Sequence, residues 1–335
     1  MREHVAAGKT EICNQTSEKI LEFLKEKLEL TEDDVYRVDD IINPGVLMEL
    51  REIDDGKMSF PEWEHFYPAS LPQEEPYWDI LKQRDIVLHV PYESYDPVIK
   101  FISDAADDPS VLAIKMTLYR TGKDSPIVAA LERAARNGKQ VVVLVELKAR
   151  FDEERNIAWA NQLENAGVTV IYGLKNLKVH AKIIMVMRRE NDTVRRYAHL
   201  ATGNYNPKTA KLYSDLSIFT GNSEIVNDAT LFFNLVTGYS TLQSMKQLDM
   251  APVTLKSKLL SMIQREIDRS DPEHPGLIMA KMNALTHEEV IEALYKASQA
   301  GVKVLLNVRG VCMLVPGVPG LSENIKVISI VDRYL

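Results

Sequence analysis

Short apolar runs alternate with amphipathic stretches between residues 85 and 172, which predicts strands and helices in turn. Runs of strand length occupy residues 85–90, 111–118, 140–147 and 168–172. Helical patterns lie between them at residues 95–106, 125–137 and 156–166. Strand–helix alternation of this kind indicates an α/β fold, with a mostly parallel sheet covered by helices on both faces.

The chain before residue 85 lacks this alternation of strand and helix patterns. Apolar residues at helical spacing predict a helix over 18–30, and Thr31 to Asp34 has the pattern of a capping box that opens a second short helix. Residues 39–83 are rich in proline and aromatic residues. We interpret residues 1–84 as the end of a larger helical domain followed by a connector.

The strand–helix pattern returns later in the chain. Helical segments are expected at 230–237, 242–245 and 254–270. After them, 277–283 resembles 112–117, 287–300 resembles 125–137, 302–308 resembles 140–147, and 324–328 resembles 167–171. The order and spacing predict an internal duplication whose second copy is truncated.

The stretch 174–215 carries the candidate chemistry. Alternation predicts a strand in which His180 and Lys182 share one face, followed by a turn at Gly203 and Asn204. An imidazole can act as a nucleophile, and an ammonium can hold phosphate oxygens. The competing interpretation is a structural histidine, the role that we expect for His89 and His199. By the repeat, a second element matching His180 is expected about two positions beyond Leu335.

Three arginines follow predicted strand ends, where active groups of such sheets collect. They are Arg120, Arg150 and Arg309. For Arg150 an ordinary ion pair is the rival, because Asp152, Glu153 and Glu154 follow at once. Two interpretations fit Asn204 and Asn206: binding of phosphate or of His180, or turn formation.

Composition narrows the function classes. The formal net charge of −8 argues against a broad nucleic-acid-binding face, although a local basic pocket remains compatible with it. Two distant cysteines fit a reducing compartment and no disulfide framework. We expect no transmembrane segment, because no apolar run reaches the necessary ~18 residues.

An H-x-K strand with a downstream Gly-Asn turn and a duplicated α/β domain resembles the phospholipase D superfamily. The aspartate of that family's H-x-K-x4-D motif is here Met187. Longer strings, among them IKMTLYRTGKDSPIVAAL and HLATGNYNPKTAKLYSDLSIFT, resemble bacterial polyphosphate kinase of the first type. This resemblance runs from about residue 20 to residue 335.

The resemblance implies an organisation. Residues 1–84 would end the helical head domain, 85–250 would form the first phospholipase D-like C-terminal domain, and 251–335 would form the second, truncated one. The family's N-terminal domain and the end of the second C-terminal domain would be absent. The family further implies a cytoplasmic location, with peripheral membrane attachment as an option, and a homo-oligomer for the full-length protein.

The resemblance also implies the roles of site residues. His180 would be the phosphohistidine, assisted by Lys182, while Tyr213 and Arg309 would contact the nucleotide. Asn204 is a further candidate at the cofactor site, from the residue pattern and not from the resemblance. Arg120 and Arg150, which the family associates with Mg2+, would act through bound phosphate, since a guanidinium does not ligate magnesium.

The implied function is reversible transfer of the γ-phosphate of ATP to polyphosphate through His180, with ATP or ADP and polyphosphate as the substrates. Two alternatives remain: a phospholipase D-like phosphodiesterase, against which Met187 counts, and a non-catalytic polyphosphate-binding fragment.

Overall fold

The computed structural model describes residues 10–39, 44–53, 56, 60–61, 63–119, 125–146, 153–173, 177–238, 243–331 and 333–334. The chain divides into two compact units, residues 1–63 and 64–335. The smaller unit contains β1 (Thr10–Cys13), α1 (Glu18–Leu28), the 3-10 helix η1 (Glu32–Asp34), β2 (Val35–Val38) and η2 (Pro44–Ile53). Strands β1 and β2 are parallel, and the predicted helix and capping box are both confirmed.

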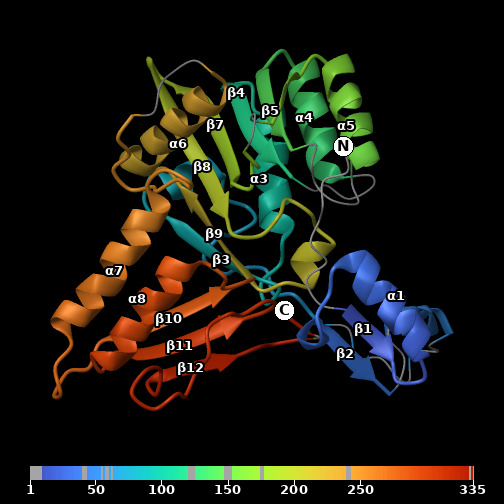
Figure 1. Cartoon of the computed structure of the whole chain (residues 1–335). Coiled ribbons are helices and arrows are strands. Elements are labelled where there is room, and N and C mark those ends of the chain that lie inside the picture. Colours follow the sequence, from blue (N-terminus) through green and yellow to red (C-terminus); the bar gives the residue numbers. More distant parts are fainter. Residues whose placement is uncertain are drawn as a thin grey trace. The chain divides into compact units, whose positions relative to one another are not determined.

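The larger unit begins with a seven-stranded sheet and its helices (Figure 1). Its elements are α2 (Tyr77–Leu81), β3 (Ile86–Val90), α3 (Asp96–Asp107), β4 (Val111–Leu118), α4 (Pro126–Arg136), β5 (Gln140–Val145), α5 (Glu153–Asn165), β6 (Thr169–Tyr172), β7 (Lys182–Glu190), β8 (Thr193–Ala201), η3 (Thr209–Lys211), β9 (Asp215–Thr220) and α6 (Ser223–Val236). Every strand and helix predicted between residues 85 and 172 is present, with bounds shifted by a few residues at most.

The strand order is β3-β9-β8-β7-β4-β5-β6, and the expectation of a mostly parallel sheet is wrong here. Only β4–β5 and β5–β6 are parallel, whereas β3–β9, β9–β8, β8–β7 and β7–β4 are antiparallel. The reason is a change in connection after β6. Helical crossovers give way to the two-residue hairpin turn between β7 and β8, which can join only antiparallel strands.

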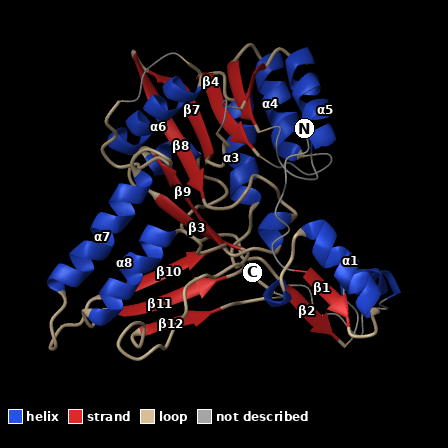
Figure 2. Ribbon diagram, viewed as in Figure 1, coloured by secondary structure: helices blue, strands red, loops and turns tan. Residues whose placement is uncertain are grey.

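Helices cover both faces of this sheet, as predicted (Figure 2). On one face, α3 and α4 bury Phe101 and Leu131 against Ile114 of β4. On the other, α6 buries Phe233 against Met185 of β7. Helix α6 begins seven residues earlier than expected, at Ser223. The second expected helix, 242–245, is wrong for its described residues 243–245, which have no helical structure.

A smaller parallel sheet, ordered β10-β11-β12, follows in the chain. Its elements are α7 (Leu255–Arg269), β10 (Leu277–Met282), α8 (Glu288–Gln299), β11 (Lys303–Val308) and β12 (Ile325–Ile328). Helices α7 and α8 bury Ile263 and Leu294 against one face of the sheet. On the opposite face Met279 is 71% exposed.

Both sheets contain a strand–helix–strand unit, β4-α4-β5 and β10-α8-β11, followed by a third parallel strand, although only the first has a helix, α5, before that strand. The hydrogen bonds between the paired strands correct the register in which the two copies match. The backbone N–H of Glu146 donates to the Leu118 carbonyl, and that of Arg309 donates to the Met282 carbonyl. Glu146 therefore matches Arg309, and Lys281 takes the place of Thr117. Sequence similarity had matched Lys281 with a lysine two positions earlier. This two-residue shift of the alignment leaves each matched side chain on the same face of its sheet, because successive side chains of a strand point to alternate faces.

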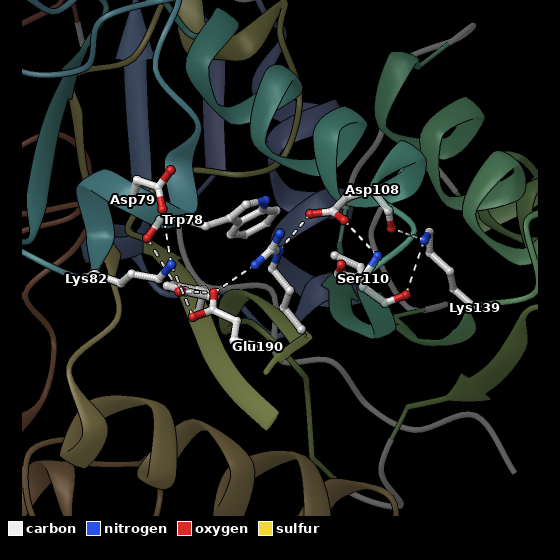
Figure 3. A network of polar contacts seen from close by, with 10 residues as sticks. Trp78, Asp79, Lys82, Asp108, Ser110, Lys139 and Glu190 are labelled. Atoms are coloured by element: carbon white, nitrogen blue, oxygen red, sulfur yellow. Dashed lines mark hydrogen bonds and ion pairs between the residues drawn. The ribbon is translucent and has the colours of Figure 1, made fainter. Parts of the chain in front are cut away.

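A polar network closes the end of the large sheet at which β7 finishes (Figure 3). The Arg188 guanidinium donates to Asp108 (Nε–Oδ2, 2.7 Å) and to Glu190 (Nη1–Oε1, 3.0 Å). Lys82 pairs with Glu190 (Nζ–Oε2, 3.2 Å), and the Tyr197 hydroxyl donates to the same carboxylate at 2.7 Å. Arg188 and the other donors hold the pKa values of both carboxyls below their ordinary range, although burial opposes them. The network ties α2 to the β7–β8 hairpin.

Candidate active site

His180 lies two residues before β7, at the edge where β4 and β5 end. Backbone hydrogen bonds on both sides of it fix its position. The Val179 N–H donates to Glu146 Oε2 (2.8 Å), and the Thr117 hydroxyl donates to the Ala181 carbonyl (2.7 Å) while accepting from the Ile183 N–H (3.1 Å). Because Glu146 is 3% exposed, its carboxylate forms a rigid anchor beneath an exposed imidazole.

Lys182, the first residue of β7, places its ammonium against the His180 ring. Its Nζ lies 2.8 Å from Nδ1 and 3.0 Å from Nε2, and it donates to the His180 carbonyl at 2.7 Å. The expectation that the two side chains share a face is thus met, although the strand starts only at Lys182. Burial of Lys182 lowers the pKa of its ammonium to about 8, and the Asp215 carboxylate opposes this change.

Tyr119 completes the surroundings of the histidine. Its ring meets the His180 ring edge to face, with centroids 4.8 Å apart. The ammonium groups of Lys178 and Lys182 lie 5.2 and 5.4 Å from its centroid, which is within cation–π range. The aromatic face therefore stabilises two positive charges beside the candidate nucleophile.

The Gly-Asn turn has a steric origin. A Cβ on Gly203 would lie 2.5 Å from Asp215 Oδ2, so only glycine allows this close approach. The Thr202 hydroxyl donates to Asp215 Oδ1 at 2.7 Å. Asp215, the first residue of β9, is thereby fixed beside the turn, and the turn serves to place a carboxylate.

The two asparagines of this segment differ in their surroundings. Asn206 Oδ1 accepts from the Lys208 N–H at 2.9 Å, which makes it a turn former. Asn204 lines an internal cavity of about 20 Å³ together with Tyr95 and His199. Among the described residues, Asn204 Oδ1, the Tyr95 hydroxyl and His199 Nε2 have no hydrogen-bond partner. A volume of this size and three polar atoms suit one water molecule.

The second sheet contributes Arg309 and Lys281, both at the carboxyl ends of their strands. The Arg309 guanidinium lies 4.7 Å from the centroid of the Tyr213 ring, and its Nε donates to Asn283 Oδ1 at 2.8 Å. Lys281 Nζ donates to the Ser214 carbonyl at 3.2 Å. Two cations from the second half therefore flank the segment that leads into Asp215.

The structure thus groups His180 with Lys182, and Tyr213 with Arg309. Arg120 and Arg150 lie outside the described residues, so their roles stay predictions. Sequence reasoning missed several residues with roles in the site: Thr117, Tyr119, Glu146, Asp215 and Lys281. Only Glu146 carried a signal, as an acidic residue directly after a very apolar strand.

The other histidines of the sheet have opposite environments. His199 is fully buried, with Nδ1 3.0 Å from the Tyr205 hydroxyl, and burial lowers its pKa to about 3. A packed structural histidine is confirmed there. For His89 that expectation is wrong: it is exposed on the edge strand β3, with Nε2 3.3 Å from the Ser214 hydroxyl.

The described residues do not form a protein metal centre. They include no group of three or more His, Cys, Asp or Glu side chains arranged to hold an ion. The described cations of the site outnumber its exposed carboxylates, because Glu146 is buried, and this donor set suits phosphate oxygens better than a bare divalent metal. In the described part of the chain, no helix is long and apolar enough to cross a membrane.

Comparison with known proteins agrees with this geometry. The family model of the polyphosphate kinase C-terminal domain 1 matches residues 76–242, and that of C-terminal domain 2 matches residues 248–335. The chain is 49% identical over 326 residues to a polyphosphate kinase of Bacillus cereus, covering 95% of this chain and 46% of that protein. It is 54% identical over 274 residues to one of Rhodopirellula baltica, covering 82% of this chain and 32% of that protein.

A solved polyphosphate kinase structure has the same fold. The polyphosphate kinase of Porphyromonas gingivalis superposes with a TM-score of 0.80 at 32% identity, covering 98% of this chain and 50% of that one. The chain therefore spans about half the length of the relatives it matches. Two adjoining family models, two relatives near 50% identity and one shared fold lead to one conclusion: this chain belongs to the polyphosphate kinase family and covers its C-terminal region.

Proposed function

We propose that this chain is the catalytic region of an ATP–polyphosphate phosphotransferase that works through a phosphohistidine at His180. The observation that carries the proposal is the exposed His180 imidazole with the Lys182 ammonium 2.8 Å from Nδ1. Arg309 and Tyr213, together with the family relationship, support a nucleotide at the same site.

In the first step a lone pair on a ring nitrogen of neutral His180 attacks the γ-phosphorus of ATP. The N–P bond forms, the bond from phosphorus to the β,γ-bridging oxygen breaks, and ADP leaves with that electron pair. In the second step a terminal oxygen of polyphosphate attacks the phosphorus, the N–P bond breaks, and His180 is restored. The reverse sequence makes ATP from ADP.

The Lys182 ammonium has a role in both steps. Without a ligand it donates to the one ring nitrogen that bears the lone pair, and a bound phosphate competes for that proton. Transfer of its hydrogen bonds to phosphate oxygens exposes the nucleophile and offsets charge at the reacting group. Arg309, Arg120 and Arg150 are proposed to bind the remaining oxygens, and Mg2+ is proposed only as an ion held by those oxygens.

Tyr213 and Asn204 have more limited proposed roles. The Tyr213 ring holds the Arg309 guanidinium over its face, so it orients a phosphate-binding arginine whether or not it also meets the base. Asn204 is proposed to bind through its amide N–H groups, because its oxygen is buried. Residues 85–250 and 251–335 are proposed as the two catalytic domains, and a cytoplasmic homo-oligomer as the state of the full-length protein.

Labelling with γ-32P-ATP tests the proposal directly. The expected product is a label that resists alkali, is lost in acid, and is absent in His180→Ala. Lys182→Arg serves as the matched variant, because it keeps the charge and should retain part of the label. A label that survives in His180→Ala would refute the assignment of the nucleophile.

A phosphodiesterase is the weaker candidate. Met187, at the position of the superfamily aspartate, packs against the apolar cluster under α6 and offers no acid or base. Steady hydrolysis of bis-p-nitrophenyl phosphate that depends on His180 would favour it. Polyphosphate binding without any phosphoenzyme would favour the third possibility, a non-catalytic binding fragment.

A further inference from the structure

Two lysines from opposite halves of the larger unit lie within electrostatic range of the same carboxylate, Asp215. Lys182 opens β7 in the first half, and Lys281 lies one residue before the end of β10 in the second. Lys281 reaches the Ser214 carbonyl, directly before Asp215. The Asp215 carboxylate acts on both ammonium groups, since it raises both pKa values against the larger lowering that burial causes.

Asp215 is held rigidly enough to serve as a fixed point. Its Oδ1 accepts from the Thr202 hydroxyl at 2.7 Å, and its Oδ2 lies against the Cα of Gly203. The Leu216 N–H also donates to Thr202 Oγ1, at 3.1 Å, which ties the start of β9 to the end of β8. The carboxylate therefore keeps its position when a ligand draws the lysines away.

Among the described residues, positive charge gathers beside Asp215. Lys182 and Lys281 both interact electrostatically with its carboxylate, and Arg309 with Lys281. Arg309 adds to the effect of burial in lowering the pKa of Lys281, which shows that the two cations are close enough to repel. Such an excess of positive charge at the carboxyl ends of two sheets favours a polyanion with several neighbouring oxygens.

We propose that Lys281 is a phosphate-binding residue contributed by the second half, and that Asp215 is the positioning residue that holds Lys281 and Lys182 toward one point. The ligand class is a condensed inorganic phosphate, whose adjacent phosphoryl groups meet the two lysines in turn. The corrected register supports this role. Lys281 occupies the place of Thr117, whose side chain reaches the same edge of the first sheet. The inference rests on the proposed function and names a residue for its polyphosphate subsite.

The test measures binding of inorganic tripolyphosphate to the 335-residue chain by isothermal titration calorimetry. Lys281→Met removes the charge from an exposed side chain, so folding is not at risk. We expect its Kd to rise about tenfold or more, equivalent to about 1.4 kcal/mol. Lys281→Arg should stay within about threefold of the parent, because arginine keeps the positive charge and can still form a charge-assisted bond to a phosphate oxygen.

Lys303→Met is the matched control. Lys303 is exposed at the opposite end of the neighbouring strand β11, so the variant makes the same change in net charge far from the site. We expect a Kd within about twofold of the parent. Equal weakening in Lys281→Met and Lys303→Met would overturn the proposal, as would absence of tripolyphosphate binding by the parent chain.

Asp215→Asn tests the positioning role through a double-mutant cycle. If Asp215 holds Lys281 in place, the effect of Lys281→Met should fall from about tenfold to below about threefold in the Asp215→Asn background. Independent, multiplicative effects would show that Asp215 does not position Lys281. A general loss of folding would not produce this selective coupling.

All binding measurements are repeated in the His180→Ala background, where no phosphohistidine can form. Loss of the label in the parent chain would sink the proposed function, yet a lysine-dependent Kd would still support the subsite. Conversely, a labelled His180 with a Kd unaffected by Lys281→Met would overturn only the subsite.

Discussion

Replacing Lys182 with methionine should stabilise the protein while it removes function. Lys182 is only 6% exposed, and burial holds the pKa of its ammonium at about 8 instead of 10.5. Methionine retains an unbranched apolar stem and buries no charge. The variant therefore removes an energetic cost that the native site carries for chemistry.

The expected magnitude follows from that pKa. Depression of the ammonium pKa from 10.5 to about 8 corresponds to roughly 3 kcal/mol of unfavourable burial at neutral pH. The variant also loses the bond from Nζ to the His180 carbonyl, which contributes roughly 1 kcal/mol. Lys182→Met should thus raise the free energy of unfolding by about 2 kcal/mol at pH 7.

The difference in stability between the parent and Lys182→Met should change with pH. Between pH 8 and 10.5 the unfolded chain keeps the lysine proton that the folded chain has lost, so the parent gains stability as the pH rises through this window. Lys182→Met lacks that gain. Its advantage should shrink from about 2 kcal/mol at pH 7 to about zero at pH 10, where the remaining burial cost and the lost hydrogen bond roughly cancel.

Urea unfolding followed by tryptophan fluorescence at pH 7 and pH 10 provides the assay. Other titrating groups are common to both chains and cancel in the difference, and equal m-values would show that the same surface unfolds in each. The reasoning is refuted if the stability difference between parent and Lys182→Met is the same at both pH values.

Three further predictions concern the supports of the site and of the sheet. Thr117→Val, which removes both hydrogen bonds to the His180 segment, should cost roughly 2 kcal/mol of stability and reduce phosphohistidine labelling, whereas Thr117→Ser should restore both. Gly203→Ala forces a Cβ against the Asp215 carboxylate, so stability should fall by roughly 1–3 kcal/mol; an unchanged urea midpoint would contradict the close approach. Arg188→Met leaves the carboxylate of Glu190 with one cation fewer and should lower the melting temperature at pH 7. The difference should shrink as the pH falls below the ordinary carboxyl value of 4.5, because the folded-state pKa of that carboxyl is depressed and its contribution is lost as the pH falls through it.

Much of the large sheet was predictable because its elements are locally encoded. Hydrophobic periodicity located β3 to β6 and α3 to α5, and glycines such as Gly138, with φ of 79°, marked where helices stop. Strand direction was not predictable in the same way. Residues 182–201 form a hairpin whose antiparallel pairing depends on a two-residue turn, and periodicity is identical in parallel and antiparallel strands.

The candidate site, like the sheet, was predictable only where its features are encoded locally. The H-x-K spacing predicted that the His180 and Lys182 side chains lie together, and they do, although His180 precedes the strand. The long-range partners of the site were out of reach: Glu146 beneath the segment, Asp215 against Gly203, and Lys281 from the second sheet. Each lies more than thirty residues from His180 along the chain or owes its place to a close approach that no local pattern records.

The sequence by itself identified the candidate nucleophile, its lysine and the arginine at the end of β11, because residue type and strand spacing define those features locally. Tertiary structure alone decided the direction of the strands, the two-residue correction of the repeat, and the approach of Lys281 and Arg309 to the segment before Asp215. These depend on pairing register and charge proximity between distant segments, and the free energy of such contacts is fixed only when the chain has folded.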